Sequence, residues 1–256
     1  MEIAEHIAAL RLQGEWLADA AERAGLDASV PPCAPWQVKD LLRHTGYVHR
    51  WAARHVTECP DQILDGPPEA EILRGGADDT RLLAWFRDGH AALVQTLATA
   101  DPAVECATFI AAPSPLAFWA RRQAHETAIH RADAESAAGA TPEYEADFAA
   151  DGIDELIMGF GRRRKYQPGS AADGTRLHML AADTGDAWLV EANEGRLQPR
   201  RNADRAEEAG CTVSGPASGL YLYLWNRADA ARVGVTVTGD PGLLSAWQAS
   251  VRVRWG

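Results

Sequence analysis

Three residues of the chain could together bind a metal ion, namely His44, Glu126 and His130. Glu126 and His130 are four residues apart, so on a helix their side chains lie on one face, about 40° apart around the axis. Carboxylate oxygen and imidazole nitrogen are both common zinc ligands. His125 is five residues from His130 and diverges from it by about 140°, so these two histidines cannot serve one site on a straight helix. A third ligand has to come from another segment.

His44 is the candidate third ligand because of its position on a predicted helix. At about 100° per residue, His44 falls on the same stripe as Val48 and Trp51, and His49 points well away from that stripe. We expect the stripe to face the core, where an imidazole without a polar partner is costly. A core histidine that forms an ordinary hydrogen bond would fit the same pattern.

The segment around Glu126 and His130 carries a polar face on a predicted helix with few large apolar residues. The residues on this face are Trp119, Arg122, Gln123, Glu126, His130 and Asp133. A solvent-exposed face would have a similar composition, so an exposed ion pair remains an alternative. Two histidines and one carboxylate around Zn²⁺ would leave a fourth coordination position open, as in catalytic zinc sites. Asp133, one turn beyond His130, could accept the second ring N–H of that histidine.

The elements that have to position these residues are helices. Apolar residues at helical spacing predict four helices, over residues 2–24, 35–56, 80–99 and 116–137. Pro35 suits the first turn of the second helix. Four long amphipathic helices with one or two longer connections are typical of a four-helix bundle.

The pattern changes after Gly139-Ala-Thr-Pro142. Strands are predicted over residues 175–181, 187–191, near 197, 211–214 and 233–238, and helices over 145–161, 216–226 and 243–253. The sequence therefore predicts a multidomain α and α+β protein. A four-helix bundle occupies residues 1–140 in this interpretation, and a small α+β domain occupies residues 141–256.

Composition excludes several classes of partner. The net charge of −11 over 256 residues argues against nucleic acid and anionic membranes as partners. No apolar run approaches the roughly 18 residues of a membrane span. The four cysteines are far apart, which fits a reducing compartment, and the N-terminus lacks the pattern of a signal peptide. We expect a cytoplasmic protein, a monomer or weak homodimer, whose partners are small molecules.

Two motifs together carry a family resemblance. The stretch Trp36-Gln-Val-Lys-Asp-Leu-Leu-Arg-His44 and the stretch from Trp119 to Asp133 resemble the mycothiol-dependent maleylpyruvate isomerase family. The segment Leu222-Tyr-Leu-Trp-Asn-Arg227 is a softer match, and the resemblance covers essentially the whole chain. Members of this family combine an N-terminal DinB-like four-helix bundle with a C-terminal domain of sterol-carrier-like shape.

The resemblance implies a ligand set and a cofactor. It implies that His44, Glu126 and His130 bind a divalent metal, zinc by preference, and that mycothiol is the thiol cofactor or co-substrate. It also implies an active-site arginine in the C-terminal domain, for which Arg227 is the first candidate and Arg232 the second. From the sequence alone, a surface charge favoured by the end of a helix explains Arg227 equally well.

The expected function is metal-dependent activation of a low-molecular-weight thiol. Zinc coordination deprotonates a thiol, and the zinc-bound thiolate would attack a small electrophilic substrate, in a thiol transferase or in a cis-trans isomerase of the maleylpyruvate type. Two alternatives stay open. Water in the open position would give a metal-dependent hydrolase, and the α+β domain could be a non-enzymatic module that binds a small apolar ligand.

The remaining candidate groups are interpreted as structural. His6, His49, His90 and His178 have no evident partner, and we expect them at the surface. The run from Arg162 to Lys165 is interpreted as a solvated helix end. Cys33 precedes the predicted helix start by two residues, about 15 Å along the axis from His44, so no internal thiol is expected near the candidate ligands.

Overall fold

The computed structural model describes residues 1–66, 76, 78–163, 172–202 and 209–251. The chain separates into two compact units, Met1–Pro142 and Glu143–Trp255. Within the described residues, no helix combines the length and the apolar character that a membrane span requires.

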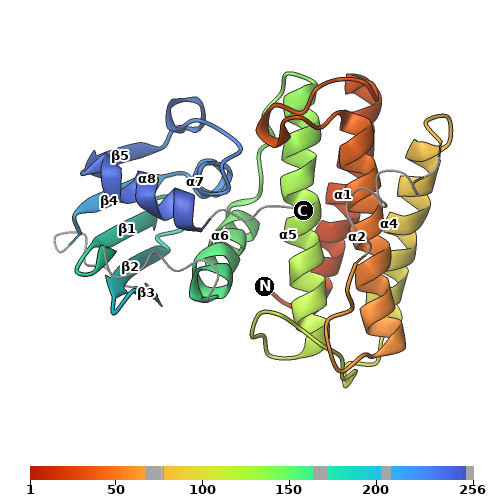
Figure 1. Ribbon diagram of the computed structural model, residues 1–256, viewed down its shortest axis with the longest axis horizontal. Helices are drawn as coiled ribbons and strands as arrows, with labels where there is room; N and C mark the ends of the chain where they lie inside the picture. The colour runs from red at the N-terminus through yellow and green to blue at the C-terminus, as the bar shows by residue number, and fades with distance from the viewer. Residues whose placement is uncertain (67–75, 77, 164–171, 203–208, 252–256) are drawn as a thin grey trace. The chain divides into compact units, whose positions relative to one another are not determined.

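In the described part of the first unit, four long helices run side by side (Figure 1). They are α1 (Ile3–Ala24), α2 (Val38–Glu58), α4 (Leu82–Thr99) and α5 (Pro115–Ala137). Helix α1 packs along α5 and α4, and α2 packs along α4 and α5. The predicted four-helix bundle is confirmed.

Apolar side chains from three of these helices form one core. Leu17 from α1, Leu41 and Leu42 from α2, and Leu82 and Phe86 from α4 are all fully buried in it. Burying a side chain of this size contributes about 1.5–3 kcal/mol, so this cluster holds α1, α2 and α4 together. Helix α5 adds only small residues such as Ala134 to the same cluster.

Helix α2 begins three residues later than the sequence indicates. Gln37 and Asp40 form a capping box at its start, so the first helical residue is Val38 and not Pro35. The residues before it are held by backbone hydrogen bonds, from Val30 N to the carbonyl of Trp36 and from Val38 N to the carbonyl of Ala28. This connection returns the chain across the end of the bundle and fixes the position of the residues between α1 and α2.

The polar residues of α5 lie inside the protein. Arg122, Gln123, Glu126, His130 and Asp133 are each at most 2% exposed. Of the two interpretations left open above, the solvated face is therefore wrong. A helix that buries charged groups needs compensating charges or hydrogen bonds for each of them.

The prediction that four histidines lie at the surface is also wrong, because His6, His49, His90 and His178 are all buried. The His49 Nε2 atom lies 2.9 Å from Thr127 Oγ1 on α5. His90 is hydrogen-bonded through Nε2 to the carbonyl of Leu10 on α1, at 2.9 Å. These partners belong to other helices, so spacing within one helix could not reveal them.

Glycine at position 14 makes room for one of these histidines. A Cβ atom on Gly14 of α1 would collide with the imidazole ring of His90. The absence of a side chain lets α1 and the α4 histidine approach closely enough for the hydrogen bond to Leu10.

The second unit is built on a mixed five-stranded sheet of order β3-β2-β1-β4-β5. Its strands are β1 (Arg176–Ala181), β2 (Ala187–Asn193), β3 (Arg196–Arg201), β4 (Cys211–Gly215) and β5 (Thr236–Gly239). Strands β1 and β4 are parallel, and the other neighbours are antiparallel. The predicted α+β class of this unit is confirmed.

Three helices accompany the sheet, namely α6 (Ala146–Asp154), α7 (Ala217–Leu224) and α8 (Pro241–Ser250). The helix predicted over 145–161 is regular only to Asp154 and continues as π and 3-10 turns to Arg162. Helix α8 begins earlier than predicted because Asp240 caps it and accepts from Gly242 N. In the basic run, Arg162 is exposed and donates to the carbonyl of Pro199, and residues 164–165 lie outside the described part of the chain.

Acidification is expected to weaken the first unit through His49. Burial lowers the pKa of His49 well below its ordinary value, and His90 lowers it further, whereas Glu126 acts in the opposite direction. Because the unfolded chain binds this proton at a higher pH than the folded chain does, the free energy of unfolding falls as the pH drops below about 6.5. Between about pH 7.5 and pH 5.5, the free energy of unfolding of His49→Gln should fall by about 1 kcal/mol less than that of the wild type. Urea denaturation followed by circular dichroism measures both free energies.

The comparison between the two proteins isolates His49. His130 has a raised pKa and contributes with the opposite sign, but it is present in both proteins. Equal losses of stability in the wild type and the variant would contradict the prediction.

Candidate metal centre

Three buried side chains from two helices converge at one point of the first unit. They are His44 from α2 and Glu126 and His130 from α5, and their ligand atoms all lie within 4.8 Å of one another. Glu126 Oε1 is 3.2 Å from His130 Nε2 and 3.8 Å from His44 Nε2. The structure thus brings together the three residues that the sequence singled out.

Helix packing explains this convergence. Glu126 and His130 are one turn apart on α5, and α2 lies against that helix. The rings of His44 and His130 meet edge to face, with centroids 5.2 Å apart. Trp36, in the connection before α2, contacts the ring of His44 from another side, at 5.0 Å between centroids.

Glu126 and His130 are each also in contact with a second polar side chain of α5. Glu126 Oε2 accepts a hydrogen bond from Arg122 Nη2 at 3.0 Å. Asp133 Oδ2 lies 2.9 Å from His130 Nδ1, so the imidazole presents its other nitrogen, Nε2, to Glu126. A carboxylate that fixes the orientation of a histidine in this way is typical of metal centres.

The cluster is strongly polarised. Burial alone would raise the pKa of the Glu126 carboxyl, but the neighbouring imidazoles and the Arg122 guanidinium outweigh burial and hold that pKa well below its ordinary value. Burial would lower the pKa of His130, but Asp133 and Glu126 outweigh burial and raise it. Glu126 is therefore ionised at neutral pH and attracts positive charge into the cluster.

Cys33 lies closer to this cluster than the sequence indicates. Its Sγ atom donates to Asp133 Oδ2 at 3.4 Å, on the same carboxylate oxygen that His130 Nδ1 contacts. The expectation that no internal thiol lies near the candidate ligands is wrong, because the residues before α2 do not continue the axis of that helix. They fold over the end of the bundle in a 3-10 turn, Pro31–Cys33, that packs against α5.

The other histidines of α2 and α5 are used elsewhere. His49 faces Thr127, and His55 contacts the carbonyl of Trp51 through Nδ1 and accepts from Leu64 N through Nε2. His125 packs edge to face against His6, with centroids 6.0 Å apart. None of them belongs to the group formed by His44, Glu126 and His130.

The sequence places Arg122 on the polar face of α5, but its contact with Glu126 is first seen in the structure. The signal was present in the spacing, because Arg122 and Glu126 are four residues apart on one helix, a separation at which opposite charges attract.

The candidate arginines lie in the second unit. Arg227 follows α7 and is half-buried, and its Nη1 donates to the carbonyl of Trp225 at 2.8 Å. Arg232 is exposed on the 3-10 turn Ala230–Val233.

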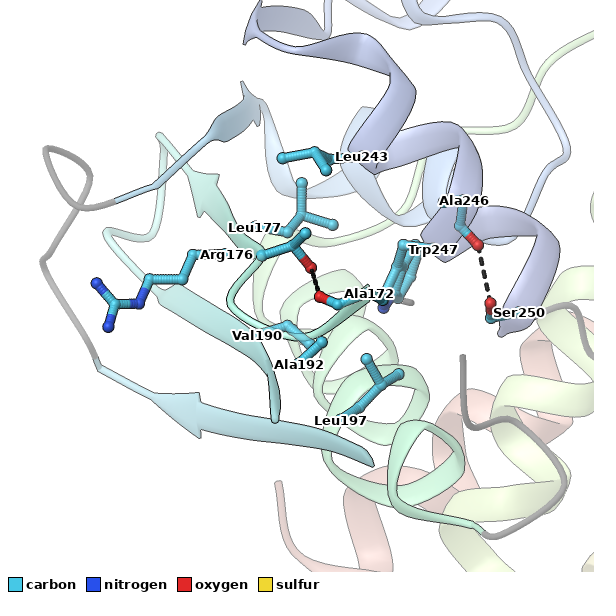
Figure 2. Close-up of a pocket in the computed structure, with 11 residues that line it drawn as sticks. Ala172, Arg176, Leu177, Val190, Ala192, Leu197, Leu243, Ala246, Trp247 and Ser250 are labelled. Carbon is cyan, nitrogen blue, oxygen red and sulfur yellow. Dashed lines mark hydrogen bonds between the residues drawn. The ribbon is translucent and has the colours of Figure 1, made fainter. Parts of the chain in front are cut away.

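The second unit also contains a pocket of about 260 Å³ between the sheet and α8 (Figure 2). Its walls are mainly apolar and include Leu177, Val190, Ala192, Leu197, Leu243 and Trp247. Arg176 borders the pocket, but its guanidinium points away from the other labelled side chains and donates to Glu191. The hydroxyls of Thr175 and Ser250 already donate to main-chain carbonyls. The pocket is therefore suited to an uncharged apolar molecule.

Both parts of the chain match known families. Residues 7–135 match the family model described as the mycothiol maleylpyruvate isomerase N-terminal domain. Residues 147–246 match the model described as the MDMPI C-terminal domain. A comparison with curated proteins returned no match.

Two solved structures share the fold. They are crystal structures of the mycothiol-dependent maleylpyruvate isomerase, with a TM-score of 0.65, and of a mutant of that enzyme, with a TM-score of 0.67. Each alignment covers 93% of this chain and 93% of the other, at 15% sequence identity. With family models matched in both halves, the chain belongs to the mycothiol-dependent maleylpyruvate isomerase family.

Proposed function

We propose that this protein is an enzyme that holds a divalent metal, zinc by preference, on His44, Glu126 and His130. At this site a bound metal would hold a low-molecular-weight thiol, mycothiol, as the thiolate for attack on a small electrophilic substrate. The convergence of three buried donor atoms from two helices carries this proposal. Membership of a family named for mycothiol and maleylpyruvate supports the choice of thiol and of substrate class.

The side chains of His44, Glu126 and His130 are suitable ligands for a metal ion. Glu126 Oε1 is buried and makes no hydrogen bond of standard geometry within the described part of the chain. Two imidazole nitrogens and one carboxylate oxygen form a donor set that is typical of catalytic zinc. When bound, Zn²⁺ supplies a centre that lowers the pKa of a coordinated thiol and holds it as the thiolate.

Neighbouring side chains orient the three candidate ligands and compensate their charge. Asp133 holds the imidazole of His130 through Nδ1, which leaves Nε2 available as a ligand. Arg122 compensates part of the negative charge of Glu126. Trp36 packs against His44 and restricts the orientation of its ring.

Isomerisation is the reaction to test first because the family is named for it. The thiolate adds to one carbon of a cis double bond conjugated to a carbonyl, so that a C–S bond forms and the electron pair moves to the carbonyl oxygen as an enolate. Rotation about the resulting single bond and expulsion of the thiolate then give the trans isomer. A thiol transferase shares the first step but releases the adduct. We propose that Arg227 binds a carboxylate of the substrate through its planar guanidinium.

Metal binding should depend on the three clustered residues. We expect the wild type to bind about one zinc ion per chain after dialysis against zinc, and both Glu126→Gln and His130→Ala to lose most of it, because each change removes a ligand. Elemental analysis of the dialysed proteins measures the stoichiometry.

A matched control is available on the same helix. Glu135 pairs with Arg131 four residues earlier, as Glu126 pairs with Arg122, but Glu135 is not part of the cluster. Glu135→Gln and the buried-histidine variant His49→Gln should retain the metal. A wild-type protein without affinity for any divalent ion would overturn the proposed function.

Thiol binding should require the metal. Isothermal titration of the zinc-loaded protein with mycothiol should show binding that releases a proton near neutral pH, because the bound species is the thiolate. The binding should be lost in His44→Ala. Arg227→Met should bind the thiol as the wild type does but turn over maleylpyruvate more slowly.

Two outcomes of this experiment would indicate a different reaction. If the zinc-loaded protein ignores mycothiol and hydrolyses amides or esters, the hydrolase interpretation replaces the thiol mechanism. If it consumes the thiol with other electrophiles and leaves maleylpyruvate unchanged, the protein is a transferase.

The apolar pocket of the second unit favours a second candidate function, the binding of a small uncharged apolar molecule. Ala246 and Ala249 are both exposed alanines of α8, but only Ala246 lines the pocket. We expect toluene or octanol to perturb the NMR signal of the Trp247 indole in the wild type and in Ala249→Phe. The larger side chain of Ala246→Phe should weaken that effect. Equal responses of the two variants would show that the pocket does not bind the probe.

A further inference from the structure

The two carboxylate oxygens of Glu126 have different neighbours. Oε1 faces the Nε2 atoms of His130 and His44, at 3.2 Å and 3.8 Å. Oε2 accepts a hydrogen bond from Arg122 Nη2 at 3.0 Å. The orientation of this carboxylate thus places Oε1 toward the proposed metal and Oε2 away from it.

Arg122 is well placed to hold that orientation. It lies one turn before Glu126 on α5 and is 2% exposed, beside a carboxylate that is 1% exposed. A guanidinium keeps its charge at all ordinary pH values. Breaking a buried ion pair is destabilising, so the contact of Oε2 with Arg122 is favoured over its release.

The number of Glu126 oxygens that bind the metal decides whether a coordination position stays open. A carboxylate can bind a metal through one oxygen or through both. A second bound oxygen would occupy the position that a three-ligand catalytic site leaves open. The group that occupies Oε2 therefore also controls whether an external molecule can reach the metal.

We propose that Arg122 is a positioning residue that restricts Glu126 to one ligating oxygen and thereby keeps a coordination position open for an external ligand. This inference rests on the proposed function, because it takes His44, Glu126 and His130 as the metal centre. It adds to that function a specific role for Arg122, which acts through Glu126.

The test uses the full-length protein loaded with Co²⁺, whose visible absorption reports the coordination of the metal, and azide as the external ligand. We expect Arg122→Met to retain Co²⁺ but to have a changed spectrum before azide is added. Its affinity for azide should fall at least about tenfold, a loss of about 1.4 kcal/mol. Arg122→Lys should recover much of the azide affinity, because an ammonium can still donate to Oε2.

Arg131→Met is the matched control. Arg131 donates to Glu135 at 2.7 Å, also four residues along α5 and also largely buried, but neither residue is among the candidate metal ligands. A loss of stability from breaking a buried ion pair should be common to both variants. The changes in the Co²⁺ spectrum and in azide affinity should appear only in Arg122→Met.

The outcomes separate this inference from the proposed function. If Arg122→Met keeps the wild-type spectrum and azide affinity, the role of Arg122 is overturned and the thiol mechanism is untouched. If the wild type binds Co²⁺ and azide but no thiol, the thiol mechanism fails and Arg122 keeps its role. A wild type that binds no metal overturns both.

If Arg122→Met fails to fold or to bind metal, a crystal structure of the zinc-loaded wild type tests the inference without any variant. It shows how many Glu126 oxygens bind the zinc. One Glu126 oxygen at about 2.0–2.2 Å from zinc, with the other on Arg122, is the expected result. Both oxygens at that distance from zinc would overturn the inference.

Discussion

The carboxylate of Glu126 lies in the interior of the helical bundle, where an ionised group is stable only if charges and hydrogen bonds replace the water it has lost. Arg122 supplies one compensating charge through Oε2, and the imidazoles of His130 and His44 approach Oε1. The other polar groups of the cluster follow from this requirement. His130 is held by Asp133, and Asp133 in turn accepts from Cys33.

The interior of a helical bundle is more often filled by apolar side chains than by charged ones. The core between α1, α2 and α4 is filled by leucines and Phe86, whereas α5 buries charged side chains from Arg122 to Glu135, over more than three of its turns. Buried ion pairs often stabilise a protein less than apolar residues of the same size. Strongly shifted pKa values in a buried cluster are instead typical of functional sites. The polar interior of α5 is consistent with the proposed function of the cluster.

The two units supply different chemical environments. The first places charged and metal-competent groups on rigid helices, which hold ligand geometry better than loops do. The second offers a mostly apolar pocket between its sheet and α8, together with the half-buried Arg227 at the end of α7.

The sequence by itself determined what depends on local periodicity. The helical repeat placed Glu126 and His130 on one face, put His44 on an inward stripe, and marked the change from helical bundle to α+β unit. Contacts between elements were decided only by tertiary structure. The burial of His49 and His90 and the contact of Cys33 with Asp133 depend on how helices pack and where a connection folds back. Arg122 combines both: its spacing from Glu126 was readable, but helix packing decided that the pair is buried. Periodicity fixes a direction around one axis, whereas burial depends on what lies in that direction.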